Sequence, residues 1–224
     1  MNASHDATAS LSQVEPGFVD PVFDSQAAFR AALQAMARPG TLQALPLPET
    51  HPPALFPATA SLLLALCDPD TRVWLAPTLD HAAAYLRFHT GCPITTVRSE
   101  ADFALIDGIT GIDPIEDFRS GTEDYPDRST TLIVQVPLLR TGAEVNSAVF
   151  DVVTSASGIP LSLSGPGIEH TARIAIGGSR REFVDQWRAR RRLFPCGNDL
   201  FLVCGDSLAA IPRSTSMELD PECM

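Results

Sequence analysis

The sequence predicts an α/β protein in which helices flank a mixed sheet. In the first half, short apolar segments of strand length alternate with segments whose apolar residues recur at helical spacing, and this alternation is typical of α/β layers. In the second half, an acidic, turn-rich loop at residues 121–129 precedes several strand-like segments with no helix between them. Links this short do not allow a parallel crossover, so we expect an antiparallel meander there.

The first predicted element is an amphipathic helix that ends at about residue 37. Asp24 or Ser25 is expected to cap its beginning, because both side chains can accept a hydrogen bond from an unpaired backbone amide. Phe29, Leu33 and Met36 fall on one side at helical spacing. We therefore expect the helix to dock on the protein through this apolar side.

Spacing and composition define the remaining elements. Further helices are predicted at residues 59–67, 79–90 and 179–193. Residues 94–97 form a short apolar segment, and strands are predicted at residues 41–45, 72–76, 103–106, 130–136, 147–154, 158–164, 171–176, 198–204 and 208–211.

One absence excludes two kinds of chemistry. All sixteen basic residues are arginine, and the chain contains no lysine. A Schiff base to pyridoxal phosphate and the phosphate-binding end of a Walker A loop both require a lysine amine. We therefore expect no pyridoxal phosphate or other cofactor, and the net charge of -11 disfavours nucleic acid as a partner.

Cysteine and histidine spacing gives no metal site. The five cysteines contain no C-x-x-C pair, and the five histidines contain no H-x-x-x-H pair. The sequence therefore predicts neither a disulfide framework nor a locally built zinc site.

The ends of the chain bound a single predicted domain at residues 17–215. Residues 1–16 lack the positive and apolar regions of a signal peptide and are expected to be a disordered lead-in, and residues 216–224 are expected to be a polar tail. The longest apolar run, residues 60–67, is too short to span a bilayer. We expect a cytoplasmic protein without membrane contact.

A glycine corner is the main candidate contact site. Leucine and serine alternate through residues 161–164, and Gly165-Pro166-Gly167 follows, a sequence typical of a type II turn. Because glycine has no Cβ, a phosphate or a neighbouring subunit could approach the amides of Gly165, Gly167 and Ile168 closely. An ordinary tight turn explains the same residues.

A run of arginines forms a second candidate site. Six arginines lie between residues 180 and 192, beside only Glu182 and Asp185. Such a stripe is typical of a solvated helix face, and alternatively it forms a docking surface for an acidic partner. The candidate docking residues are Arg188, Arg190, Arg191 and Arg192.

Three single residues are further candidates for ligand or partner contact. His89 lies in the last turn of a predicted helix, where the helix dipole favours a protonated imidazole without any ligand. Arg30 lies off the apolar side of the first helix, and Arg213 offers a guanidinium fork that matches phosphate. No carboxylate pair at a fixed spacing and no G-x-S-x-G elbow is present, so no catalytic residue is assigned.

A series of short segments recurs in a fixed order along residues 17–215. The segments are GFVDPV at 17–22, SQ at 25–26 with FR at 29–30, AMARPG at 35–40, LLALCDPDT at 63–71, FHTGCP at 88–93, ADFA at 101–104, LSLSGPGI at 161–168, FPCGNDL at 194–200 and PRST at 212–215. In this order they resemble the PhnH family, the H subunits of the bacterial carbon-phosphorus lyase system. The ordered set is specific although single pieces are not. Ser214, where threonine is more usual, and Cys196, where a small or apolar residue is more usual, are minor departures.

The resemblance implies a cytoplasmic homodimer whose fold is similar to that of pyridoxal phosphate-dependent transferases but lacks the cofactor. It implies work with G, I and L subunits in replacing the adenine of ATP by methylphosphonate, which gives ribose methylphosphonate triphosphate. It also implies membership of a core complex with the J subunit, which carries the radical cleavage step. It transfers no catalytic residue to a position of this chain.

Two functional readings follow. The first is a non-catalytic assembly or regulatory subunit, favoured by the missing lysine, the absent acid/base couple and the proline- and glycine-rich loops. The alternative is an enzyme component that binds a triphosphate nucleotide or a phosphonate directly through arginines and backbone amides. No independent catalysis is expected from the first reading.

Overall fold

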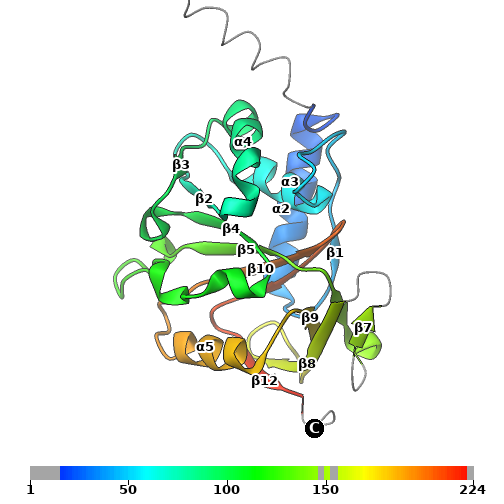
Figure 1. Ribbon diagram of the computed structural model, residues 1–224. Coiled ribbons are helices and arrows are strands. Elements are labelled where there is room, and N and C mark those ends of the chain that lie inside the picture. The colour runs from blue at the N-terminus through cyan, green and yellow to red at the C-terminus, as the bar shows by residue number, and fades with distance from the viewer. Residues whose placement is uncertain (1–15, 146–148, 152–155, 221–224) are drawn as a thin grey trace, which may run out of the picture.

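The computed structural model describes residues 16–145, 149–151 and 156–220, and their strands form two sheets of different design (Figure 1). The larger sheet has seven strands in the order β1-β11-β10-β5-β4-β2-β3, and the smaller has the order β12-β8-β9-β6 with β7 paired to β8. Helices accompany both sheets. The predicted α/β class with a mixed sheet is confirmed.

The larger sheet is mostly parallel. The neighbours from β10 to β3 all pair in parallel, whereas β11 pairs antiparallel with β10 and β1 pairs antiparallel with β11. Its strands are β1 (Gln43–Ala44), β2 (Val73–Leu75), β3 (Ile94–Thr95), β4 (Phe103–Asp107), β5 (Thr131–Gln135), β10 (Leu200–Cys204) and β11 (Ser207–Ile211).

The smaller sheet is antiparallel throughout, which confirms the prediction for the segments around residues 149–177. Its strands are β6 (Leu139–Thr141), β7 (Val149–Asp151), β8 (Ala156–Ser164), β9 (Ala172–Gly177) and β12 (Ser216–Leu219).

The expected place of β5 in the antiparallel meander is wrong. β5 lies between β4 and β10 and pairs in parallel with both. The chain between β4 and β5 contains short 3-10 turns at Ile109–Ile112 and Ile115–Asp117 instead of a regular helix. These turns supply the long connection that a parallel pair requires. The expectation considered only the strand segments that follow β5, whereas the partners of β5 are β4 and β10.

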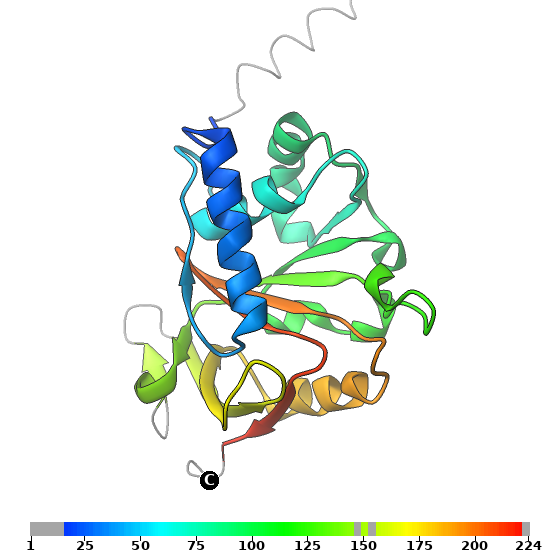
Figure 2. The ribbon, with the colours of Figure 1, turned by 180° about the vertical axis from the view of Figure 1, so that it is seen from behind.

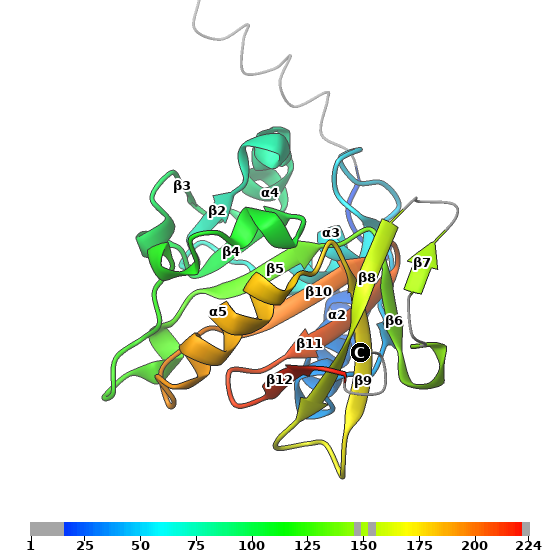
Figure 3. The ribbon, with the colours of Figure 1, turned by 60° about the horizontal axis from the view of Figure 1, so that its bottom comes forward.

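The helices lie on different sides of the larger sheet. α3 (Pro57–Leu66) and α4 (Ala83–Thr90) lie on one side and α5 (Arg181–Arg191) on the other (Figure 1). α2 (Pro21–Ala37) runs along the outside of the molecule (Figure 2) and packs against α3 and β11. α5 lies beside the smaller sheet, where it packs on β12 (Figure 3).

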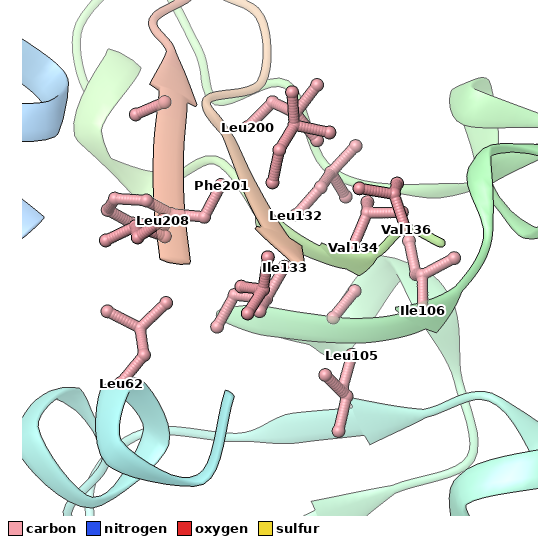
Figure 4. Close-up of a cluster of buried hydrophobic side chains, with 14 of the residues drawn as sticks. Leu62, Leu105, Ile106, Leu132, Ile133, Val134, Val136, Leu200, Phe201 and Leu208 are labelled. Carbon is pink, nitrogen blue, oxygen red and sulfur yellow. The ribbon is translucent and has the colours of Figure 1, made fainter. Parts of the chain in front are cut away.

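The core is built on both faces of the central strands, as expected for parallel strands with nearly continuous apolar runs. Leu105 of β4 and Ile133 of β5 are register partners, and they share the side on which Leu62 of α3 lies (Figure 4). Leu132 and Val134 point to the opposite side. All five side chains are fully buried, so apolar packing covers both faces of the larger sheet.

The predicted cap of α2 is wrong, and its predicted docking side is wrong for two of three residues. Asp20 caps the helix, because its side chain accepts a hydrogen bond from the Phe23 amide at 3.1 Å. The fully buried residues of α2 are alanines and Phe29 and Leu33 are exposed, whereas Met36 is half-buried and packs against the core as expected. Alanine lets a helix approach its neighbours closely, so the small residues face the protein and the bulky ones face outward. The buried residues of α2 are Ala28, Ala32 and Ala35.

The two ends of the chain differ from expectation in one respect. The predicted N-terminal lead-in lies outside the described residues apart from Pro16. The predicted C-terminal tail begins instead with strand β12, in which Met217 is buried opposite Leu163 of β8. Within the described ranges, no helix is both long and apolar enough to cross a membrane.

Candidate functional site

The glycine corner adopts the turn that its sequence predicts. The amide of Ile168 donates a hydrogen bond to the carbonyl oxygen of Gly165 at 3.1 Å. Gly167 has a φ of +83°, the left-handed value required at the third position of a type II turn. The corner therefore ends β8 and turns the chain toward β9.

The chain's own backbone occupies the space that the corner glycines leave open. A Cβ on Gly167 would overlap the carbonyl oxygen of Ala37, and a Cβ on Gly165 would lie 3.1 Å from the carbonyl oxygen of Ser214. The Ile168 amide is already used in the turn. The corner thus meets the end of α2 and the segment before β12. We call this contact region of three segments the motif junction, and it consists of residues 37–40, 164–168 and 212–215.

The motif junction brings together three of the segments on which the family resemblance rests, although they lie far apart in the sequence. Gly40 belongs to the same contact region, since a Cβ there would lie 2.7 Å from the Cβ of Ala172 and 3.3 Å from Leu163. Small residues at these positions let the smaller sheet approach α2. Close backbone approach at the junction is therefore intramolecular.

Arg213 is fully engaged within the protein. Its Nε donates to both carboxylate oxygens of Asp199 at 3.1 and 3.2 Å, and its Nη2 donates to Oδ2 of Asp199 at 2.5 Å. Nη2 also donates to the hydroxyl of Ser129 at 2.7 Å, and Nη1 donates to the carbonyl oxygen of Pro126. The guanidinium fork expected to hold a phosphate is therefore bound to a carboxylate instead.

Arg190 does not belong to an exposed docking patch, which corrects the expectation for this residue. Its side chain is buried and donates to the amide oxygen of Asn198 from Nε at 3.1 Å and from Nη2 at 2.6 Å. Nη2 also donates to the carbonyl oxygen of Phe118 at 3.2 Å. Burial lowers the pKa of the Arg190 guanidinium, and Glu116 opposes this shift. Arg190 therefore ties α5 to the larger sheet.

The other three candidate arginines are exposed on α5 or just after it. Arg188 lies 3.6 Å from Asp185 and 3.9 Å from Glu218. Arg191 donates from Nε to the carbonyl oxygen of Ser214 at 3.3 Å, which places it beside the motif junction. Leu193 and Phe194 follow Arg192 and are also exposed. The end of α5 thus presents basic and apolar side chains together.

His89 and Arg30 do not lie at the motif junction. The His89 ring contacts Tyr85 in a tilted arrangement at 4.4 Å and Phe88 edge to face at 5.0 Å between centroids. A Cβ on Gly17 would lie 3.1 Å from its Nδ1, so His89 packs where the chain approaches α2. Arg30 is exposed on α2. The candidate residues therefore form separate sites.

The sequence interpretation missed an exposed apolar surface. Four large side chains of α2 point outward although the helix packs against α3 and β11. The signal that could have revealed them is the series of alanines at positions 28, 32 and 35, which follow helical spacing as well as the larger residues do. We call this surface the α2 apolar face, and its residues are Val22, Phe23, Phe29 and Leu33.

One open hollow lies on the smaller sheet. It has a volume of about 420 Å³ and contains the ion pair between Arg173 and Asp220, whose Nε and Oδ2 are 2.5 Å apart. The hollow also contains Glu218 and the hydroxyls of Ser162 and Ser164. In the part of the chain that the structure describes, no three His, Cys, Asp or Glu side chains gather as a metal-binding group.

Comparisons with known proteins agree on one family. A family model described as "Bacterial phosphonate metabolism protein (PhnH)" matches residues 16–218. The chain is 37% identical over 210 residues to the alpha-D-ribose 1-methylphosphonate 5-triphosphate synthase subunit PhnH of Rhizobium meliloti (strain 1021), covering 92% of this chain and 97% of that protein. It is also 26% identical over 194 residues to a putative C-P lyase subunit protein, HtxG, of Stutzerimonas stutzeri, covering 87% of this chain and 86% of that protein.

Proposed function

The chain belongs to the PhnH family of bacterial phosphonate metabolism proteins, and from this premise we propose that it is an assembly subunit of a carbon-phosphorus lyase system. In this role it assists the transfer of the ribose triphosphate of ATP to methylphosphonate without carrying out the chemistry itself. The names of both relatives describe subunits, which supports a function within a complex.

The α2 apolar face is the observation that carries this proposal. Phe29 and Leu33 are about half exposed, and Val22 and Phe23 are exposed even further. A contiguous group of large apolar side chains on a protein surface marks a site of contact with another molecule. Arg30 lies seven residues after Phe23 and three before Leu33, so helical spacing places a positive charge beside these side chains. The face therefore suits an apolar groove with a carboxylate at its edge.

The engagement of Arg213 and the glycine corner argues against direct triphosphate binding there. Arg213 is bound to Asp199 and Ser129, and the Ile168 amide closes the turn. A phosphate would have to displace these partners. We therefore propose that the motif junction holds the smaller sheet against α2.

The same proposal includes the partners of the chain and its location. The partners are a second copy of this chain and subunits of the G, I, J and L types, and the location is the cytoplasm, as the family resemblance implies. The likeness to pyridoxal phosphate-dependent transferases is supported by the mostly parallel larger sheet with helices on both sides. A Schiff base to the cofactor would still require a lysine, and the chain has none.

Disruption of the α2 apolar face tests the proposal. The variant carrying Phe29→Glu and Leu33→Glu should stay folded, because both side chains point to solvent, but it should lose association with co-expressed G, I, J and L subunits. Val97→Glu is the matched control, since Val97 is 46% exposed and Phe29 is 47% exposed. Copurification of the complex and light scattering of the isolated chain measure the effect. Unchanged assembly of the double variant would refute the docking role of α2.

A further inference from the structure

The parallel strands of the larger sheet are added on both sides of β2. Along the chain these strands follow in the order β2, β3, β4, β5 and β10, but across the sheet their order is β3-β2-β4-β5-β10 (Figure 1). The chain therefore places β3 on one side of β2 and the later strands on the other side. In open α/β sheets, ligands bind outside the carboxyl ends of the strands where the strand order reverses in this way. The carboxyl ends of β2 and its neighbours are thus the part of this fold best suited to a ligand.

A hollow of about 450 Å³ opens at the carboxyl ends of β2 and β3. Trp74 of β2 and Thr95 of β3 are register partners, and both line it. Asp80, in the 3-10 turn after β2, and Arg98, in the 3-10 turn after β3, also line the hollow. Pockets of roughly 300–1,000 Å³ hold small molecules, so the hollow is large enough for one.

The Arg98 guanidinium is held in place by groups of the protein. Its central carbon lies 4.7 Å from the centroid of the Trp74 ring and 5.1 Å from that of Phe118, distances typical of cation–π contacts. Nη1 donates to the carbonyl oxygen of Asp113 at 2.9 Å and lies 3.7 Å from Oδ2 of Asp117. The guanidinium is therefore oriented before any ligand arrives.

The edge of Arg98 formed by Nε and Nη2 is available to a ligand. In Arg213 the same two nitrogens hold the carboxylate of Asp199. In Arg190 they hold the amide oxygen of Asn198. Among the described residues, neither Nε nor Nη2 of Arg98 has a hydrogen-bond acceptor. Two parallel N–H groups of this kind match the two oxygens of a carboxylate.

Part of the wall of the hollow is apolar. Leu75 at the end of β2, Pro77 after it and Ile94 of β3 line the hollow together with the Trp74 ring. Contact with these side chains removes an aliphatic chain from water, which favours its binding. The hollow therefore suits a ligand that combines an aliphatic chain with an oxyanion.

We propose that this hollow binds a small aliphatic monocarboxylate. The two ligand oxygens accept hydrogen bonds from Nε and Nη2 of Arg98, and the aliphatic chain lies against the apolar wall. Asp80 lines the hollow and Asp117 lies near Arg98, so a second negative charge on the ligand is repelled. The inference goes beyond the assembly role and does not depend on it, because none of these residues belongs to the α2 apolar face or the motif junction.

Titration of the full chain with butyrate, followed by the indole N–H signals in a proton–nitrogen NMR spectrum, tests the site. The chain has two tryptophans and therefore two such signals. Trp74 lines the hollow, whereas the indole of Trp187 donates to the carbonyl oxygen of Thr215 inside the protein. We expect butyrate to shift the Trp74 signal alone, with a dissociation constant of roughly 1–10 mM for so small a ligand. Trp74→Phe assigns the signal.

Matched anions test the selectivity of the hollow. Succinate has the chain length of butyrate and a second carboxylate, and acetate lacks most of the chain. We expect both to bind at least about fivefold more weakly than butyrate. Asp80→Asn should bring the affinity for succinate closer to that for butyrate. The proposal is overturned if succinate or methylphosphonate shifts the Trp74 signal at lower concentration than butyrate does.

Replacement of Arg98 separates a specific site from weak binding to any arginine. Arg98→Gln should abolish the butyrate shift, and Arg98→Lys should weaken binding about tenfold, because an ammonium group keeps the charge but not the paired N–H groups. Arg128→Gln is the matched control, since Arg128 stacks on Tyr125 at 4.1 Å and does not line the hollow.

The Trp187 signal and the unfolding midpoint show whether each variant is folded. Asp80 is exposed, so Asp80→Asn should fold even if the Arg98 variants do not, and an unchanged ratio of succinate to butyrate affinity in Asp80→Asn contradicts the proposal. A butyrate shift that survives in folded Arg98→Gln contradicts it as well. So does a wild-type Trp74 signal that stays in place up to about 100 mM butyrate.

Discussion

Gly167 lies so close to the carbonyl oxygen of Ala37 that a Cβ on Gly167 would overlap this oxygen. The contact joins the turn after β8 to the end of α2, and it sits where three sequence segments typical of the family meet. The glycine corner is thus required by contact within the chain. Its backbone packs against α2 and the segment before β12, and this fixes the smaller sheet relative to α2.

Replacing Gly167 by alanine should destabilise the protein more than the same replacement at a glycine that has a left-handed backbone but no close neighbour. Gly167 and Gly178 have similar φ values of +83° and +77°, but no atom lies within 4 Å of a Cβ on Gly178. We expect Gly178→Ala to lower the free energy of unfolding by about 1–2 kcal/mol and Gly167→Ala by about 3–4 kcal/mol, since the second also creates overlap. Urea denaturation measures the free energy of unfolding of both variants. Equal losses of this free energy would show that the backbone at Ala37 moves away from the new Cβ without destabilising the protein.

Replacing Arg213 should reveal a structural residue. Arg213→Gln removes the paired hydrogen bonds to Asp199 and leaves that carboxylate, which is 22% exposed, with fewer partners. We expect a loss of about 2–3 kcal/mol in the free energy of unfolding. Arg192→Gln, at an exposed position, should cost less than about 0.5 kcal/mol. A fully stable Arg213→Gln protein that binds ATP more weakly would instead assign Arg213 to a ligand.

Most regular elements follow from the sequence because local patterns determine them. The turn at Gly165-Pro166-Gly167 needs only proline and glycine chemistry, and α3 and α5 follow from composition and spacing. The pairing of β5 does not follow from local patterns. Its parallel order depends on a long connection, which between β4 and β5 consists of 3-10 turns. Strand β12 lies in the predicted polar tail, because its pairing with β8 is a contact between distant segments that no local pattern shows.

The candidate sites were harder to predict because a side chain's partner is set by tertiary contact. Nothing in the sequence near Arg190 distinguishes it from Arg191 or Arg192, and yet Arg190 alone of the three is buried, on the amide of Asn198. Helical periodicity allows either side of α2 to dock, and only the shape of the protein selects the alanine side.

Charge reversal on α5 should weaken assembly in a salt-dependent manner if its exposed end contacts an acidic partner. The double variant Arg188→Glu and Arg192→Glu should lower the affinity for the other subunits roughly tenfold at low salt, and the difference should shrink at 0.5 M salt because exposed charges are screened. Arg181→Glu, at the other end of the same helix, serves as the control. Equal affinities of all three proteins at low salt would identify the stripe as a solvated helix face.

The reactivity of Cys92 should depend on pH in a way that reports its neighbours. Only the thiolate reacts with an alkylating agent, and an ordinary cysteine is half ionised near pH 8.5. The pKa of Cys92 is lowered to about 6, so its alkylation rate by a small chloroacetamide should rise through pH 6 and level off by about pH 8. Cys67→Ala removes the thiol that donates to Cys92, which should move the midpoint upward. Mass spectrometry of the peptide of residues 88–98 gives the rate, and Cys196 in the same sample provides the reference. A wild-type midpoint near 8.5 would show that Cys67, Thr90 and Arg87 do not stabilise the Cys92 thiolate.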